Sequence, residues 1–91
     1  MLHIQIERTI SAERQLELGI HNWPFWEKNI SSFPWTYDCL ETCYLIEGEV
    51  IVTPKGGESV TIHAGDLATF PAGMSCTWQV TKNLRKYYCF K

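Results

Sequence analysis

Turn-forming residues recur at short intervals through the middle of the chain, and this spacing limits the chain to a fold made of short strands. The stretch Glu41–Gly48 ends in glycine, and the stretch Gly65–Gly73 begins and ends with one. Between them, two alternating runs, 49–53 and 59–63, flank the turn cluster Pro54-Lys-Gly-Gly-Glu58. Alternation with a period of two is typical of strands, and a break rich in proline and glycine between two such runs predicts a hairpin.

The rest of the chain adds further short strands and one helix. Predicted strands cover 3–7, 35–46, 67–70, 74–80 and 85–90, with a turn at 81–83. Ser11 can cap a helix of about two turns that stops at Gly19, and so short a helix needs Leu16 or Leu18 packed on the sheet. About eight strands, with turns every 8 to 12 residues or so, predict an all-β jelly-roll barrel in a single domain, residues 1–91.

Two aromatic stretches interrupt this pattern. Trp23-Pro-Phe-Trp26 shows neither a helical nor a strand period. It is interpreted as a hydrophobic plug over one end or face of the barrel, with a subunit interface and ligand stacking as alternatives. Ser31-Ser-Phe-Pro34 is interpreted as a break before the long strand that begins at Trp35.

Charge and hydropathy exclude several kinds of partner. Eight Lys and Arg against ten Asp and Glu give a net charge of -2 without a basic stripe, so nucleic acid is not expected. No apolar run approaches the roughly 20 residues of a membrane span, and the N-terminus does not resemble a secretory signal, so we expect a cytoplasmic protein and no membrane. The four cysteines, Cys39, Cys43, Cys76 and Cys89, are then expected to be free thiols.

Two parts of the sequence resemble the two motifs of the cupins. Glu41, followed seven positions later by Gly48, resembles the end of the first motif, G-x5-H-x-H-x3-E-x6-G. Gly65, Pro71 and Gly73 resemble the second, G-x5-P-x-G-x2-H-x3-N. The resemblance implies an RmlC-like double-stranded β-helix, in which the inward residues of the two motifs meet near one mouth.

A more specific pattern resembles the small single-domain cupins grouped with the ureidoglycine aminohydrolase cupin domain. Its parts are Trp23-Pro-x-Trp26, Glu41-Thr-Cys-Tyr44, Phe70-Pro71-x-Gly73 and Cys76-x-Trp78. The likeness covers roughly residues 20 to 90. It implies an aminohydrolase-like activity if the protein is an enzyme, and a homodimer is expected by analogy with the fold.

The resemblance also implies where a metal would bind. In metal-dependent cupins the motif histidines would fall at positions 35, 37 and 76, where this chain has Trp35, Tyr37 and Cys76, and only Glu41 is retained. Metal sites on this scaffold rely on imidazoles, so no cofactor is expected here. If a divalent metal such as manganese or zinc binds, Glu41, Cys76 and Tyr37 are its candidate ligands.

The side chains expected to point inward form an aromatic pocket around one carboxylate. The candidate ligand-binding residues are Trp35, Tyr37, Glu41, Cys76, Trp78, Lys86 and Tyr88. A carboxylate in such a pocket must be paired, hydrogen-bonded to Tyr37 or Lys86, or protonated. Glu41 and Cys76 are the candidate catalytic residues, as a general base and a thiol nucleophile.

Three functions remain open from the sequence. The favoured one is a binding protein that holds a small polar or cyclic molecule in the barrel without a histidine-based metal site. The second is a metal-dependent, aminohydrolase-like enzyme that uses Glu41, as the resemblance implies. The third is a structural or dimeric interaction module whose interior is solid core.

Overall fold

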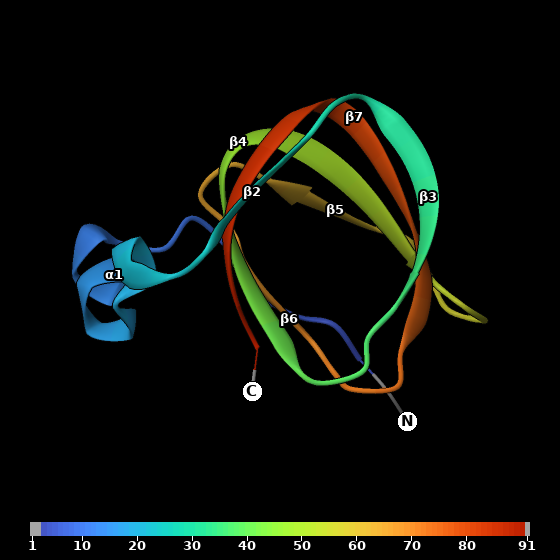
Figure 1. The fold of residues 1–91 in the computed structure, drawn as a ribbon, viewed down its shortest axis with the longest axis horizontal. Coiled ribbons are helices and arrows are strands. Elements are labelled where there is room, and N and C mark those ends of the chain that lie inside the picture. The colour runs from blue at the N-terminus through green and yellow to red at the C-terminus, as the bar shows by residue number, and fades with distance from the viewer. Residues whose placement is uncertain (1–2, 91) are drawn as a thin grey trace.

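The computed structural model describes residues 3–90, most of which belong to one antiparallel β-structure. Its elements are β1 Gln5–Glu7, α1 Ala12–Leu18, the 3-10 turn η1 Ile20–Asn22, β2 Phe25–Lys28, β3 Ser31–Thr36, β4 Glu41–Pro54, β5 Val60–His63, β6 Leu67–Phe70 and β7 Ser75–Phe90. Figure 1 shows the strands curving round a common interior, with α1 to one side. The predicted all-β barrel with one short N-terminal helix is confirmed.

Two long strands, β4 and β7, hold the two layers of the barrel together. They pair with each other from Glu41↔Phe90 to Pro54↔Cys76. One layer runs β1–β6–β4–β7–β2, and the other runs β5–β4–β7–β3. The predicted hairpin between 49–53 and 59–63 is confirmed as the β4–β5 pair. Because each long strand belongs to both layers, the apolar faces of the two layers enclose one core.

The turn predicted at 81–83 is wrong, because β7 runs through it without a break. Lys82 pairs with Glu49, and the register between β4 and β7 shifts at several points between Leu45 and Val50. Such bulges bend a strand and increase its twist. The two long strands therefore pass from one layer to the other by bending together, and the polar residues that suggested a turn lie at the bend.

The single strand predicted for 35–46 is also wrong. The chain forms β3 up to Thr36, leaves the sheet, and enters β4 at Glu41. The connection is held by Tyr37, whose backbone N–H donates to Met74 O and whose carbonyl accepts from Gly73 N. Pro34, which was interpreted as part of a break, is tolerated inside β3 because β3 is an edge strand, whose one partner strand among residues 3–90 is β7.

The first aromatic stretch also contains an edge strand that the sequence did not predict. β2 begins at Phe25 and pairs with the C-terminal half of β7. Within it, Trp26 packs against the core while Phe25 is exposed on the other face. The hydrophobic-plug interpretation therefore holds for Trp26, but its ring covers the core as part of a strand.

The helix has the predicted ends but not the predicted packing. Ser11 Oγ accepts a hydrogen bond from Arg14 N, and Gly19 adopts a left-handed conformation with φ of 66°. Leu16, however, is 73% exposed, Leu18 is half-buried, and no residue of α1 is buried. Ile20, in the turn that follows, is fully buried, so this residue attaches the N-terminal segment to the core.

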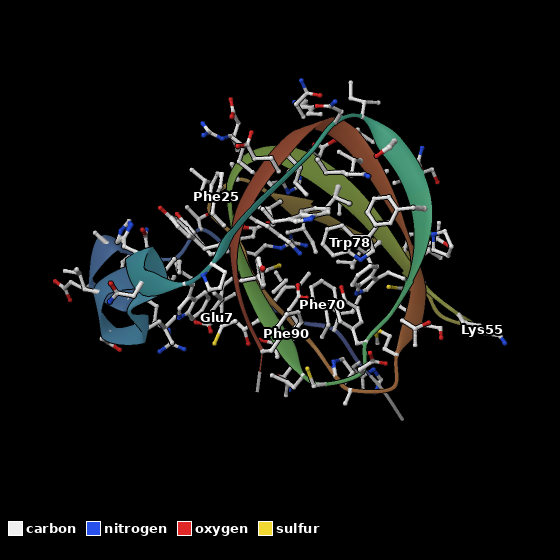
Figure 2. The ribbon with its side chains drawn as sticks, viewed as in Figure 1. Glu7, Phe25, Lys55, Phe70, Trp78 and Phe90 are labelled. Carbon is white, nitrogen blue, oxygen red and sulfur yellow. The ribbon has the colours of Figure 1, made fainter. Side chains whose placement is uncertain are left out.

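The core is apolar and contains free thiols. Its largest fully buried side chains include Trp78, Phe70, Leu45 and Ile62. Figure 2 shows Trp78 and Phe70 in the interior enclosed by the strands. All four cysteines are free, as predicted. Within residues 3–90, no helix is long and apolar enough to cross a membrane.

Asp66 is a buried carboxylate that ties the N-terminal segment to the barrel. It accepts hydrogen bonds from Arg8 Nη1 at 2.7 Å, from Thr9 N at 3.1 Å and from His63 N at 2.9 Å. Burial by itself would raise the pKa of Asp66, but the backbone N–H groups and the guanidinium together hold it below its usual range. Arg8 is half-exposed, so we assign most of the stabilisation to the two backbone donors.

We expect Asp66→Asn to lower the free energy of unfolding by about 1–3 kcal/mol at pH 7. The asparagine amide carries no negative charge, and its NH2 group would face hydrogen-bond donors where an acceptor is needed. A carboxylate whose pKa is lowered in the folded state stabilises that state fully at pH values above its unfolded-state pKa of about 4. This stabilisation is lost as the pH drops toward the folded-state pKa. The difference in unfolding free energy between the natural protein and Asp66→Asn, measured by urea unfolding, should therefore be smaller at pH 3 than at pH 7. Asp38→Asn, at an exposed position, is the matched control. A difference in unfolding free energy that stays constant from pH 7 to pH 3 would contradict the stabilising role of the Asp66 charge.

Candidate functional site

A cavity of about 170 Å³ opens between the two layers of the barrel. Seven of its nine lining residues are aromatic, and the other two are a carboxylate and an ammonium. The lining consists of Trp26, Phe33, Trp35, Tyr37, Glu41, Trp78, Lys86, Tyr88 and Phe90. Trp35 and Phe90 are 48% and 52% exposed, which places them where the cavity meets solvent. The cavity is therefore apolar on its walls, polar at one place and open at its mouth.

Strand alternation explains why these side chains converge. Lys86, Tyr88 and Phe90 are two residues apart on β7 and therefore share its inner face. Phe33 and Trp35 do the same on β3, opposite Trp78 and Cys76 of β7. Glu41 begins β4 and pairs directly with Phe90, which brings its carboxylate to the same end of the barrel.

The polar part of the cavity is a buried ion pair. Lys86 Nζ donates a hydrogen bond to Glu41 Oε2 at 2.9 Å, and the two residues are only 6% and 3% exposed. The ammonium also lies 4.8 Å from the ring centre of Trp26, 4.6 Å from that of Trp78 and 5.8 Å from that of Tyr88. A carboxylate and three electron-rich ring faces therefore surround one positive charge.

Tyr37 provides a neutral phenol beside this pair. Its ring stacks on Phe70 at 4.8 Å between centroids, with 8° between the planes, and its hydroxyl accepts a hydrogen bond from Trp78 Nε1 at 3.1 Å. Burial, reinforced by the nearby Glu41 carboxylate, raises the pKa of Tyr37 far above its usual value. The hydroxyl therefore keeps its proton and can donate it in a hydrogen bond.

Cys76 is buried and is not part of the cavity lining, and its Sγ points to the carbonyl oxygen of Trp35 at 3.6 Å. Burial raises the pKa of Cys76 and the Glu41 carboxylate raises it further, while the nearby Trp78 indole lowers it in part. Burial likewise raises the pKa of Cys43 to about 11. Both environments favour the thiol over the thiolate, which argues against Cys76 as a nucleophile.

The residues present do not fit a divalent metal ion. Glu41 is already neutralised by an ammonium at 2.9 Å, and the other two candidate ligands, Tyr37 and Cys76, both have raised pKa values. Metal ligation needs the phenol and the thiol in their deprotonated forms. In the described part of the chain, no group of three or more His, Cys, Asp and Glu side chains is arranged to hold a metal.

Six of the seven ligand-binding residues predicted from the sequence line the cavity, and Cys76 is the exception. The candidate ligand-binding residues did not include Phe33 and Phe90, and Trp26 was considered for ligand stacking only as an alternative. The spacing of Phe33 and Trp35, two apart, was the available signal, since residues two apart on a strand share a face. Pro24, just before β2, and Pro34, inside β3, obscured the strand pattern. A proline argues against a predicted strand, although an edge strand tolerates one.

The fold and the cavity define a small cupin barrel, and comparison with known proteins supports this class. The model of the EutQ-like cupin domain family matches residues 15–88. The chain therefore belongs to the EutQ-like cupin domain family. No match was found among curated proteins.

Solved structures give the same result. A protein of the DUF861 family from Thermotoga maritima is 44% identical to this chain with a TM-score of 0.94, and the match covers 98% of this chain and all of that one. A candidate ethanolamine utilization protein Q from Salmonella typhimurium is 31% identical with a TM-score of 0.64, over 70% of this chain and 51% of that one. The EutQ protein of Clostridium difficile is 20% identical with a TM-score of 0.65 over 97% of this chain, which shows a shared fold.

Proposed function

We propose that this protein binds a small ring-shaped molecule in the aromatic cavity and does so without a metal ion. The observation that carries the proposal is the open cavity of about 170 Å³ with seven aromatic residues in its lining. An apolar cavity of about 150 Å³ is large enough for one benzene-sized ring. A ligand of one ring with a few substituents therefore suits this space.

The exposure of the mouth also supports a binding role. Trp35 and Phe90 present about half of their surfaces to solvent although both adjoin an apolar cavity. Large aromatic surfaces left open around a cavity are typical of ligand sites. A solid-core interaction module would fill this space with its own side chains, so the cavity argues against that alternative.

The aminohydrolase-like alternative has less support. It requires a metal at Glu41, whose Oε2 is bonded to Lys86, and the two other candidate ligands are disposed to keep their protons. The family that matches is the EutQ-like one, and the grouping with the ureidoglycine aminohydrolase cupins stays a prediction. The favoured function is therefore binding rather than metal-dependent hydrolysis.

A fragment screen tests the proposal, with tryptophan emission as the readout. Three of the four tryptophans, Trp26, Trp35 and Trp78, line the cavity, so a bound ring should change their fluorescence. We expect Trp35→Ala to weaken binding of a one-ring fragment roughly threefold to tenfold, because one aromatic contact is lost. Phe25→Ala is the matched control, since Phe25 is an exposed aromatic residue outside the cavity lining. Equal losses in both variants, or no fragment binding at all, would contradict the proposal.

A further inference from the structure

The charges in the cavity favour an uncharged ligand. Among residues 3–90, its charged lining residues are Lys86 and Glu41 alone, which carry opposite charges and are bonded to each other. A cationic ligand would be repelled by the ammonium, and an anionic ligand would be repelled by the carboxylate. The apolar surroundings screen such repulsion poorly. A neutral molecule meets neither penalty.

The aromatic cage around the ammonium leads to the same conclusion. Rings and a carboxylate of this kind are the usual recognition elements for an organic cation. Here the faces of Trp26, Trp78 and Tyr88 are already directed at Lys86 Nζ, at 4.6 to 5.8 Å. The protein's own lysine occupies the cation position, so a ligand cation has no place to replace it.

The ion pair nevertheless leaves hydrogen-bonding capacity on the cavity side. Glu41 Oε2 is bonded to Lys86, whereas Oε1 has no hydrogen-bond partner among residues 3–90. No fully buried side-chain oxygen or nitrogen of those residues lacks a partner, and Glu41 itself lines the cavity, so we infer that Oε1 is open to it. The ammonium has three hydrogens, of which the carboxylate uses one, and Lys86 is itself among the residues that line the cavity.

An acceptor and a donor therefore lie side by side at the polar end of an apolar cavity. Oε1 belongs to the same carboxylate whose other oxygen contacts Nζ, so the two groups are held next to each other by covalent geometry and one hydrogen bond. The complementary ligand edge has an N–H next to a C=O, both on the same side. A ring that contains an amide enforces this arrangement, and the aromatic walls accept its flat faces.

We propose that the cavity recognises an uncharged, planar ring with a cyclic amide edge, whose N–H donates to Glu41 Oε1 and whose C=O accepts from Lys86 Nζ. This inference rests on the proposed binding function and names the chemical class of its ligand. It assigns separate roles to the two parts of the site, since the aromatic walls bind the ring and the ion pair selects its edge.

The test compares two rings of the same size, 2-pyridone and 2-pyranone, in which a ring oxygen replaces the N–H. We expect 2-pyridone to bind about tenfold more tightly in fluorescence or NMR titrations, because 2-pyranone presents an oxygen to Glu41 Oε1 and leaves that oxygen unpaired. Benzene reports on the walls alone, and benzylamine and benzoate report on charge. Both charged rings should bind more weakly than 2-pyridone.

A double variant, Glu41→Met with Lys86→Met, separates the two roles because it removes both charges together. It should bind benzene at least as well as the natural protein does and should lose the preference for 2-pyridone. Equal binding of 2-pyridone and 2-pyranone by the natural protein, or tighter binding of a charged ring, would overturn the amide-edge inference while the binding function stands. If none of these rings binds, benzene included, the binding function fails with it.

Discussion

A Lys86→Met variant should lose about 3–5 kcal/mol of unfolding free energy at pH 7, which is the usual effect of breaking a buried ion pair. Methionine is similar in length but leaves the Glu41 carboxylate, 3% exposed, without its counter-charge. The loss should lie toward the lower end of this range, because Glu41 lines the open cavity, where water can partly solvate its carboxylate. Urea unfolding, monitored by tryptophan emission, measures the change.

The double variant distinguishes an uncompensated charge from lost packing. Replacing a whole buried ion pair by apolar residues is often nearly neutral, so Glu41→Met with Lys86→Met should recover most of the stability that either single change removes. Lys82→Met, on the same strand but exposed, is the control and should change stability by about 0.5 kcal/mol or less. Additive losses in the double variant would show that Glu41 and Lys86 do not stabilise each other.

Gly48→Ala should be comparably damaging, with a loss of at least about 3 kcal/mol, because two separate costs coincide at this glycine. Its φ is 96°, a conformation that residues with a side chain rarely adopt. A Cβ at this position would also collide with the carbonyl oxygen of Asn83 and lie 2.9 Å from the Cα of Leu84. Both contacts are with backbone of β7, which cannot move without disturbing the bend that joins the two layers.

Gly56→Ala separates these two costs. Gly56 also has a positive φ, 74°, but a Cβ there meets nothing of residues 3–90 within 4 Å. The alanine at this position should cost only about 1–2 kcal/mol, the price of the left-handed conformation alone. Thermal or urea unfolding of both variants gives the difference, which we attribute to the contact with β7. Equal losses would mean that the close approach of β4 and β7 at Gly48 contributes nothing.

Much of the cavity could be predicted because its residues follow the period of two. Tyr88 shares a face with Lys86 on β7, and Trp78 lies on the inner face of the same strand. The predicted need for a partner at Glu41 was also sound, because a buried carboxylate must be paired or hydrogen-bonded. The two partners considered were Tyr37 and Lys86, and the structure selects Lys86.

The errors came from local signals that long-range pairing overrides. Thr81-Lys-Asn83 has the composition of a turn, yet it continues β7 because β4 bends with it. Pro34 has the character of a strand breaker, yet it lies in β3 because the edge of a sheet tolerates its missing N–H. Leu16 or Leu18 was expected to pack on the sheet, yet Leu16 is exposed and Leu18 only half-buried, and the fully buried residue is Ile20 in the turn after α1.

The sequence by itself determined the all-β class, the central hairpin, the ends of the helix, and which residues of the cavity strands share a face. These features depend on neighbouring residues, whose periodicity and turn chemistry act over a few positions. The tertiary structure alone decided the path of the bent strands, the place of Trp26 and Phe33 in the cavity wall, and the pairing of Lys86 with Glu41. That pair joins residues 45 positions apart. Whether two such groups meet depends on the register of several strands at once, which no local sequence pattern determines.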